Sequence, residues 1–292
     1  MVDLRRAAFG DRPDLDVSAA TFDPDPWRRW LAAVALGGQG RYAAATALLH
    51  PLSRHHDPVI AALAATALSS HRRQLGAHAP ARVLDALALS RIAEIPPSRL
   101  RASTDPDSVD AAGARVDALL GLAADAIGLG RLTEARRLHE AATRAADPAA
   151  WRPAVRVGWV AAEIELASGR PDAAIHSAER VIPVAEEAPS TRHRAKSALV
   201  LGTALATADA PAATTALDRA LGWASRFGLL PLLWPSALVR ADLSDTGEAA
   251  ALRRDAAAAL REILRRSDSD GRLFAAASPW LPSGLLRSGD PP

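Results

Sequence analysis

The sequence predicts an all-α protein built from stacked antiparallel helix pairs. Three observations support this fold class: alanine and leucine supply most of the apolar residues, aromatic residues make up only 4% of the chain, and one helix–turn–helix pattern recurs. Alanine and leucine are among the strongest helix formers, whereas alanine packs little side chain onto a pleated sheet. Stretches such as 255–260, DAAAAL, are therefore expected to form closely packed helices.

The recurring pattern is clearest in residues 119–146 and 158–185. Each segment has an amphipathic stretch rich in small residues, a Gly-Arg turn, and a second amphipathic stretch with alanine five residues after the glycine. Weaker copies occur elsewhere at similar spacing, which is the signature of a helical repeat. The turns lie at Gly40, Gly76, Gly130, Gly169, Asp209 and Gly247. Successive turns are 36 to 40 residues apart, except for one interval of 54 residues.

The long interval contains residues 95–109, IPPSRLRASTDPDSV, whose proline, serine and aspartate content is typical of a loop. Without this loop insertion the interval matches the others, so the sequence predicts a repeat domain of six helical hairpins over residues 25–267. Residues 1–24 are polar, and we expect a flexible N-terminal segment. Residues 268–292 are expected to form a C-terminal cap, which covers the exposed end of the stack, and a tail.

The residues around each turn have a physical role. A glycine can take the left-handed conformation that ends a first helix, and proline is tolerated in the first turn of a second helix. Small residues seven before and five after each turn let the two helices approach closely. These pairs are Ala33 with Ala45, Ser69 with Ala81, Ala123 with Ala135, Ala162 with Ala174, and Gly202 with Thr214. The sixth copy, with Arg240 and Leu252, departs from the rule, as expected of a terminal repeat.

The glycine turns, paired small residues and near-constant hairpin length resemble tetratricopeptide-repeat (TPR) units, especially the longer, degenerate repeats of bacterial regulators. The hairpins exceed the usual 34 residues, and only Tyr42 fits the aromatic preference that follows the turn. The resemblance implies an α-α superhelix of about six stacked TPR-like hairpins. It also implies a non-catalytic protein–protein interaction scaffold that binds a partner protein or peptide in its concave groove.

The resemblance further implies that the first helix of every hairpin lines the groove. The positions expected to face it are Trp30, Asp117, Arg156, Trp159, Glu163, Lys196 and Thr203. Arg156, Trp159 and Lys196, with Thr203, would form an aromatic and basic patch for an acidic or C-terminal peptide segment. Two alternatives stay open at this stage: tryptophans that only fill gaps in an alanine-leucine core, and a solvated groove without a dominant contact.

Several kinds of site are excluded by residue type. The chain has no cysteine, hence no disulfide and no cysteine-bound zinc, and it lacks glycine-rich phosphate loops, GxSxG and HExxH. A dense cluster at His50, His55, His56 and Asp57 has metal-binding residue types, but flanking prolines place it in a loop where polar residues gather. We therefore expect no enzymatic activity, no cofactor and no metal.

Location and partner class follow from apolar runs and charge. No apolar run approaches the roughly 18 residues of a membrane span, and the start, MVDLRR, is not followed by the apolar core of a signal peptide. We expect a cytoplasmic protein without a membrane span. Nucleic acid is not expected as a partner, because the net charge is only +2.

The alternative function is a nucleic-acid-associated regulator that uses arginine-rich helix faces. Arginines concentrate within residues 131–144 and 253–266, where they could contact phosphates. Acidic residues interleave with them at the spacing of neighbours on a helix, so ion pairs within each helix are the simpler explanation. This alternative predicts binding that weakens steeply with salt.

Overall fold

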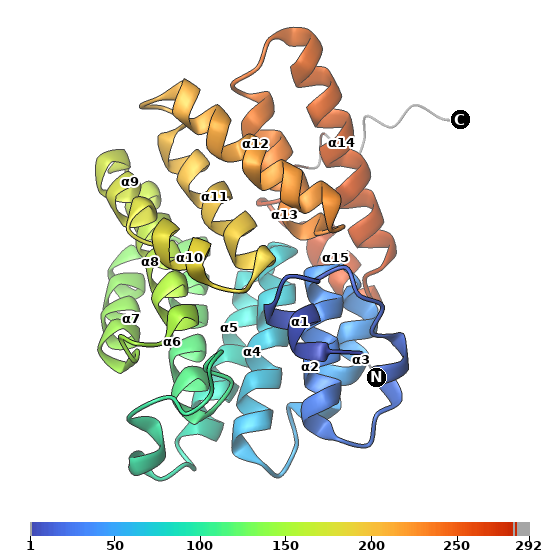
Figure 1. The fold of residues 1–292 in the computed structure, drawn as a ribbon, viewed down its shortest axis with the longest axis vertical. Helices are drawn as coiled ribbons and strands as arrows, with labels where there is room; N and C mark the ends of the chain where they lie inside the picture. The colour runs from blue at the N-terminus through green and yellow to red at the C-terminus, as the bar shows by residue number, and fades with distance from the viewer. Residues whose placement is uncertain (1, 283, 285–292) are drawn as a thin grey trace.

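The computed structural model describes residues 2–282 and 284, and these residues form helices and loops without a strand (Figure 1). As the sequence predicts, six antiparallel helix pairs follow one another along the chain. They are α2 (Pro26–Gly38) with α3 (Tyr42–Leu52), α4 (Pro58–Gln74) with α5 (His78–Ile92), α6 (Ala111–Gly128) with α7 (Leu132–Ala145), α8 (Trp151–Ala167) with α9 (Pro171–Glu179), α11 (Thr191–Leu205) with α12 (Ala210–Arg226), and α13 (Leu230–Ala241) with α14 (Thr246–Arg265). A short helix, α10 (Ile182–Glu187), follows α9. We number these hairpins one to six.

The predicted turns are confirmed in hairpins one to four, where a glycine with φ between 68° and 76° ends each first helix. These glycines are Gly40, Gly76, Gly130 and Gly169. In hairpin five Asp209 caps α12 by accepting the Ala212 N–H. The turn predicted at Gly247 is wrong: residues 242–245 form it, because Asp245 caps α14 by accepting the Glu248 N–H at 3.0 Å.

Close helix approach within the hairpins also agrees with the sequence. The small residues predicted to face each other in hairpins one to four are all fully buried: Ala33, Ala45, Ser69, Ala81, Ala123, Ala135, Ala162 and Ala174. In hairpin five, a Cβ on Gly202 would lie 2.6 Å from the Leu217 Cγ atom. Larger side chains at these positions would force the paired helices apart.

The first helices pack against one another in chain order, from α2 through α4, α6, α8 and α11 to α13. They form an inner layer, and the second helices lie outside it. Figure 1 shows the chain turning from the blue hairpins through green and yellow until the red helices return beside the blue ones. The backbone N–H of Ala43 donates to the Arg266 carbonyl at 2.7 Å, and Tyr42 is buried with Leu260 and Ile263. The stack therefore closes on itself, and hairpin six contacts hairpin one.

The N-terminal segment differs from the expectation of a flexible chain. It contains α1 (Leu4–Phe9) and a short 3-10 helix (Ser18–Phe22), and the side chains of Leu4, Phe9 and Val17 are buried in the core around α2. Although this segment is polar overall, Asp3 caps α1 and the few apolar residues are spaced so that α1 buries them together. Amphipathic spacing, rather than apolar content, determines this packing.

The loop at 95–109 is tied to its surroundings. It contains a short 3-10 helix (Pro97–Leu100), its ends Ile95 and Val109 are buried, and the Asp110 carboxylate accepts the backbone N–H of Thr104. The loop is thus a structured part of the stack.

After hairpin six, α15 (Ser269–Ala277) packs on hairpin two, where Arg72 forms two hydrogen bonds with Asp268 at 2.7 and 3.0 Å. Because the stack closes, this predicted cap covers a junction between hairpins. Of the predicted cap and tail, residues 283 and 285–292 lie outside the described residues.

Candidate functional site on the inner surface of α8 and α11

Four of the residues predicted for the groove come together on two neighbouring first helices. Arg156, Trp159 and Glu163 lie on α8, and Lys196 lies on α11. The Lys196 ammonium is 4.7 Å from the centre of the Trp159 ring and 3.3 Å from the Glu163 carboxylate. A cation over an indole face is attracted by the negative charge of the ring. These contacts form a mixed aromatic and charged cluster that links hairpins four and five.

Trp159 forms the base of this cluster and is 5% exposed. Its indole N–H donates to the Ser197 hydroxyl at 2.9 Å, and its ring stacks on His193 at 5.2 Å between centroids. The imidazole is held in turn by Ser190, whose fully buried hydroxyl lies 2.7 Å from Nδ1 of His193. The indole is therefore fixed in position. Because it is buried, the parts of the cluster that reach the surface are the charged side chains above it.

Arg156 is held by Asp117 of α6, which also binds a residue that sequence reasoning missed. The Asp117 carboxylate lies 3.0 Å from Nε of Arg156 and 2.8 Å from Nη1 of Arg152, one turn earlier on α8. Burial, partly offset by Asp117, lowers the pKa of Arg156. Asp117 supplies one negative charge to the two guanidinium groups of Arg152 and Arg156, so a net positive charge remains at this point.

Two further side chains of α11, the neutral His193 and the cationic Arg192, lie near the same region. Burial lowers the pKa of His193 well below its usual value, and Arg192, Arg152, Arg156 and Lys196 lower it further, so the imidazole is neutral. Arg192 reaches α2, where its Nη1 lies 3.4 Å from the Val34 carbonyl, and burial with Arg156 lowers its pKa to about 10. A guanidinium near the C-terminal end of a helix also complements the helix dipole. This surface is therefore cationic overall.

The remaining predicted residues occupy different environments. Trp30 lies on α2 at 3% exposure, packed against Phe9 at 5.9 Å between ring centroids, and Asp117 is likewise buried. Thr203 lies two turns beyond Lys196 on α11 and donates to the Leu199 carbonyl at 2.8 Å. Among the seven predicted residues, Arg156, Glu163, Lys196 and Thr203 keep partly exposed side chains. Sequence offsets place all seven residues on first helices, but neighbouring helices determine which side chains stay accessible.

A second polar network lies deeper, between hairpins two and three. Arg73 of α4 binds Asp85 of α5 at 2.5 Å and Asp125 of α6 at 2.7 Å, and both carboxylates are fully buried. Ser69 also donates to Asp85 at 2.6 Å. Burial raises the pKa of Asp85 to about 8, against the attraction of Arg73, because two carboxylates share one cation. This network joins three helices and carries a proton at neutral pH.

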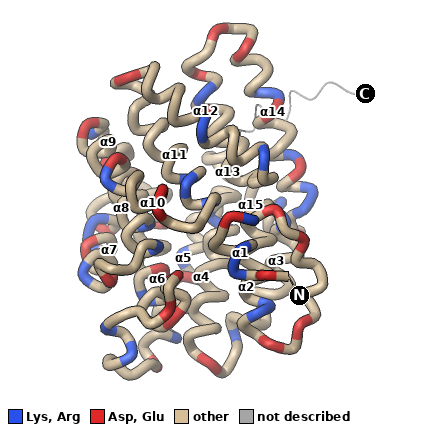
Figure 2. Tube along the Cα trace, viewed as in Figure 1, with Lys and Arg blue, Asp and Glu red and all other residues tan. Residues whose placement is uncertain are grey.

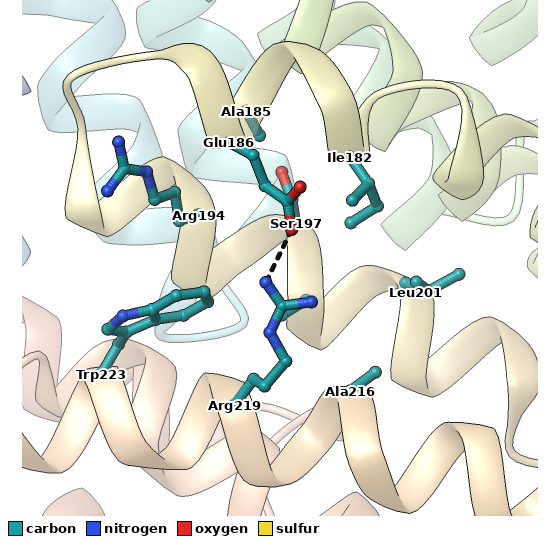
Figure 3. A pocket seen from close by; sticks show the side chains of 10 residues that line it. Ile182, Ala185, Glu186, Arg194, Ser197, Leu201, Ala216, Arg219 and Trp223 are labelled. Atoms are coloured by element: carbon teal, nitrogen blue, oxygen red, sulfur yellow. Dashed lines mark hydrogen bonds and ion pairs between the residues drawn. The ribbon is translucent and has the colours of Figure 1, made fainter.

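Figure 3 shows a cavity between α10, α11 and α12, lined in part by Ser197. It has a volume of about 20 Å³, apolar walls that include Ile182, Leu201 and Trp223, and a Glu186–Arg219 ion pair of 2.6 Å that spans it. Pockets for drug-sized ligands usually measure about 300–1,000 Å³. The cavity is too small for a small-molecule site of that kind.

Two members of the histidine and aspartate cluster at residues 50–57 make local structural contacts. Asp57 caps α4 by accepting the Val59 N–H at 2.8 Å, and Nδ1 of His55 accepts the Asp57 N–H. The described residues contain no group of three or more histidine and carboxylate side chains arranged around a common metal position. Nor does any helix in this part of the chain have both the length and the apolar character needed to cross a membrane.

Part of the positive charge on the arginine-rich helices is paired with nearby carboxylates. Figure 2 shows basic and acidic positions interspersed on most helices. On hairpin three, Arg131 pairs with Glu134 and Arg136 with Glu165 at 2.7 Å. On α14 the cations in ion pairs are Arg253, Arg265 and Arg266, with Asp242 or Glu262 as partners. Such pairing reduces the positive field that a phosphate backbone would require.

Comparison with solved structures shows a likeness to a Rap protein, solved as a complex with competence and sporulation factor. The superposition has a TM-score of 0.57 and 14% sequence identity, and it covers 86% of this chain and 71% of the Rap chain. No protein-family model matches the chain, and no curated protein matches its sequence. At this identity the likeness shows a shared all-α helical repeat fold. The TPR resemblance of the individual units stays a sequence-based prediction.

Proposed function

We propose that this chain is a non-catalytic protein–protein interaction scaffold that binds a partner on the inner surface of α8 and α11. The observation that carries the proposal is the cluster of Arg156, Glu163 and Lys196, partly exposed above a rigid and internally satisfied Trp159. Support also comes from the fold, because the similar Rap protein was solved with a partner molecule, competence and sporulation factor.

The chemistry of the cluster favours an acidic segment or a C-terminal carboxylate as the bound group. Lys196 is paired with Glu163, and their side chains are 36% and 33% exposed. An ion pair at such exposure is worth about 0–1 kcal/mol. An incoming carboxylate can therefore replace Glu163 at little cost and gain a charge-assisted hydrogen bond.

Lys196→Glu tests the site with little disturbance to the fold, because the side chain is partly exposed. Trp159→Ala is unsuitable, since this indole is buried and its loss would weaken the contact between α8 and α11. Arg137→Glu, an exposed change of equal charge on the outer helix α7, is the matched control. We expect affinity capture from host lysate to lose the partner with Lys196→Glu and keep it with Arg137→Glu. Equal recovery with both variants would contradict the proposed site.

A further inference from the structure

Residues 2–16, which we call the strap, lie against the first helices of three separate hairpins. Phe9 packs on Trp30 of α2, and the Arg152 guanidinium of α8 lies 5.5 Å from the centre of the Phe9 ring. The backbone N–H of Thr191, at the start of α11, donates to the Gly10 carbonyl at 3.1 Å. Figure 1 shows α1 between α2 and α11, consistent with its contacts to both helices. One short segment thus touches hairpins one, four and five.

The polar contacts of the strap are of the kind by which proteins bind a separate peptide. The Arg5 guanidinium binds the carboxylates of Asp105 and Asp107 in the 95–109 loop, the latter at 2.6 Å. The Gln39 side-chain amide donates to the carbonyls of Pro13 and Leu15, at 2.9 and 3.1 Å. Side-chain recognition of charge, together with donors to exposed carbonyls, is a common way for proteins to bind peptides.

The strap depends on this docking for its own structure. Its helix α1 has six residues, and isolated helices of that length are unstable in water. The fit is also imperfect, because the buried indole N–H of Trp30, beside Phe9, has no acceptor among the described residues. A buried donor without an acceptor carries a desolvation cost that a better-matched ligand could remove.

We infer that the strap is an intramolecular ligand on a peptide-docking surface formed by α2, the 95–109 loop and the first turns of α8 and α11. The kind of partner that fits is a short amphipathic segment with an arginine and, four residues later, an aromatic side chain, like Arg5 and Phe9. The arginine matches Asp105 and Asp107, and the aromatic ring lies between Trp30 and Arg152. Such a segment competes with the strap.

This inference goes beyond the proposed function and uses different residues from the Lys196 cluster. The two surfaces are nevertheless neighbours on the same helices. Arg152 precedes Arg156 by one turn of α8, and Thr191 precedes Lys196 on α11. Displacement of the strap therefore uncovers the N-terminal end of the α8–α11 surface, which couples the two binding events.

The test uses the full chain and a fluorescent synthetic peptide of residues 2–16. A chain with Arg5→Glu and Phe9→Ala should release its own strap and bind the added peptide at least ten times more tightly than the unaltered chain. A chain with Arg12→Glu should behave like the unaltered chain, because Arg12 pairs only with Asp14 inside the strap. A peptide with the Arg5→Glu and Phe9→Ala changes should not bind. Fluorescence anisotropy measures each affinity, and circular dichroism checks that each chain is folded.

Equal affinity of the peptide for the released and unaltered chains would overturn the inference, as would absence of binding to a folded released chain. If the released chain does not fold, hydrogen exchange on the unaltered chain decides. Exchange of the α1 amides well before those of α2 and α8 would support a displaceable strap. Exchange of α1 only together with those helices would overturn it.

Discussion

Asp85 and Asp125 share the guanidinium of Arg73 in the protein interior, and this arrangement makes stability depend on pH. Burial raises the pKa of Asp85 to about 8, so the folded protein keeps a proton that the unfolded chain releases above about pH 4. Between these values the folded state binds more protons than the unfolded state. Asp85 therefore lowers the free energy of unfolding as pH rises, by up to about 1.4 kcal/mol per pH unit.

Two buried histidines act in the opposite direction over part of this range. Burial lowers the pKa of His71 to about 3, and burial with nearby cations lowers that of His193 well below 6.5. Both are neutral in the folded protein and protonated in the unfolded chain below about pH 6.5, so their effect raises stability as pH rises to that value. Above it the effect of the histidines fades, while that of Asp85 persists to about pH 8. Together these contributions make the free energy of unfolding fall by about 1 kcal/mol between about pH 6.5 and 8.

Urea unfolding at several pH values in this window measures the effect. Asp85→Asn keeps the shape of the protonated carboxyl group and should abolish the decline. Asp242→Asn, at a side chain that is 74% exposed, should leave the decline unchanged. The reasoning is refuted if the unaltered protein does not lose stability from about pH 6.5 to 8, or if Asp85→Asn loses as much.

Three further predictions concern packing and hydrogen bonding. A Cβ on Gly37 would overlap the His71 imidazole, so Gly37→Ala should cost about 1–3 kcal/mol in urea unfolding. Gly222→Ala, in an exposed part of α12 with open space around it, should instead stabilise by up to about 1 kcal/mol, and loss of stability there would contradict the account. Arg72→Met removes both hydrogen bonds to Asp268 and should speed hydrogen exchange in α15 while α8 is unaffected. Unchanged exchange in α15 would show that other contacts hold it.

Local features of the fold could be predicted from the sequence because they depend on neighbouring residues. Glycine turns and small-residue pairs need only helix geometry, and both are present in hairpins one to four. Long-range features could not be predicted. Closure of the stack depends on contacts such as Ala43 with Arg266, and docking of the strap depends on Arg5 meeting Asp105 across 100 residues. Each pairs residue types that occur many times in the chain.

In the candidate site, too, local features could be predicted from the sequence and contacts between distant residues could not. The resemblance to TPR units placed Arg156, Trp159 and Lys196 on groove-facing first helices, and the structure brings Lys196 over the Trp159 ring. The sequence could not show that His193 stacks on the Trp159 indole, because that contact depends on how α8 and α11 are shifted relative to each other. The spacing of Arg152 and Arg156, one turn apart, was visible in the sequence, but their shared partner on α6 was not.

Affinity capture of the tagged protein from host lysate, with and without nuclease, followed by mass spectrometry, tests the central claim most directly. An interaction scaffold should retain a stoichiometric protein partner after nuclease treatment, and Lys196→Glu should lose that partner while Arg137→Glu keeps it. Recovery that disappears with nuclease, and weakens steeply with salt, would contradict the scaffold and place binding on the arginine-rich helices instead.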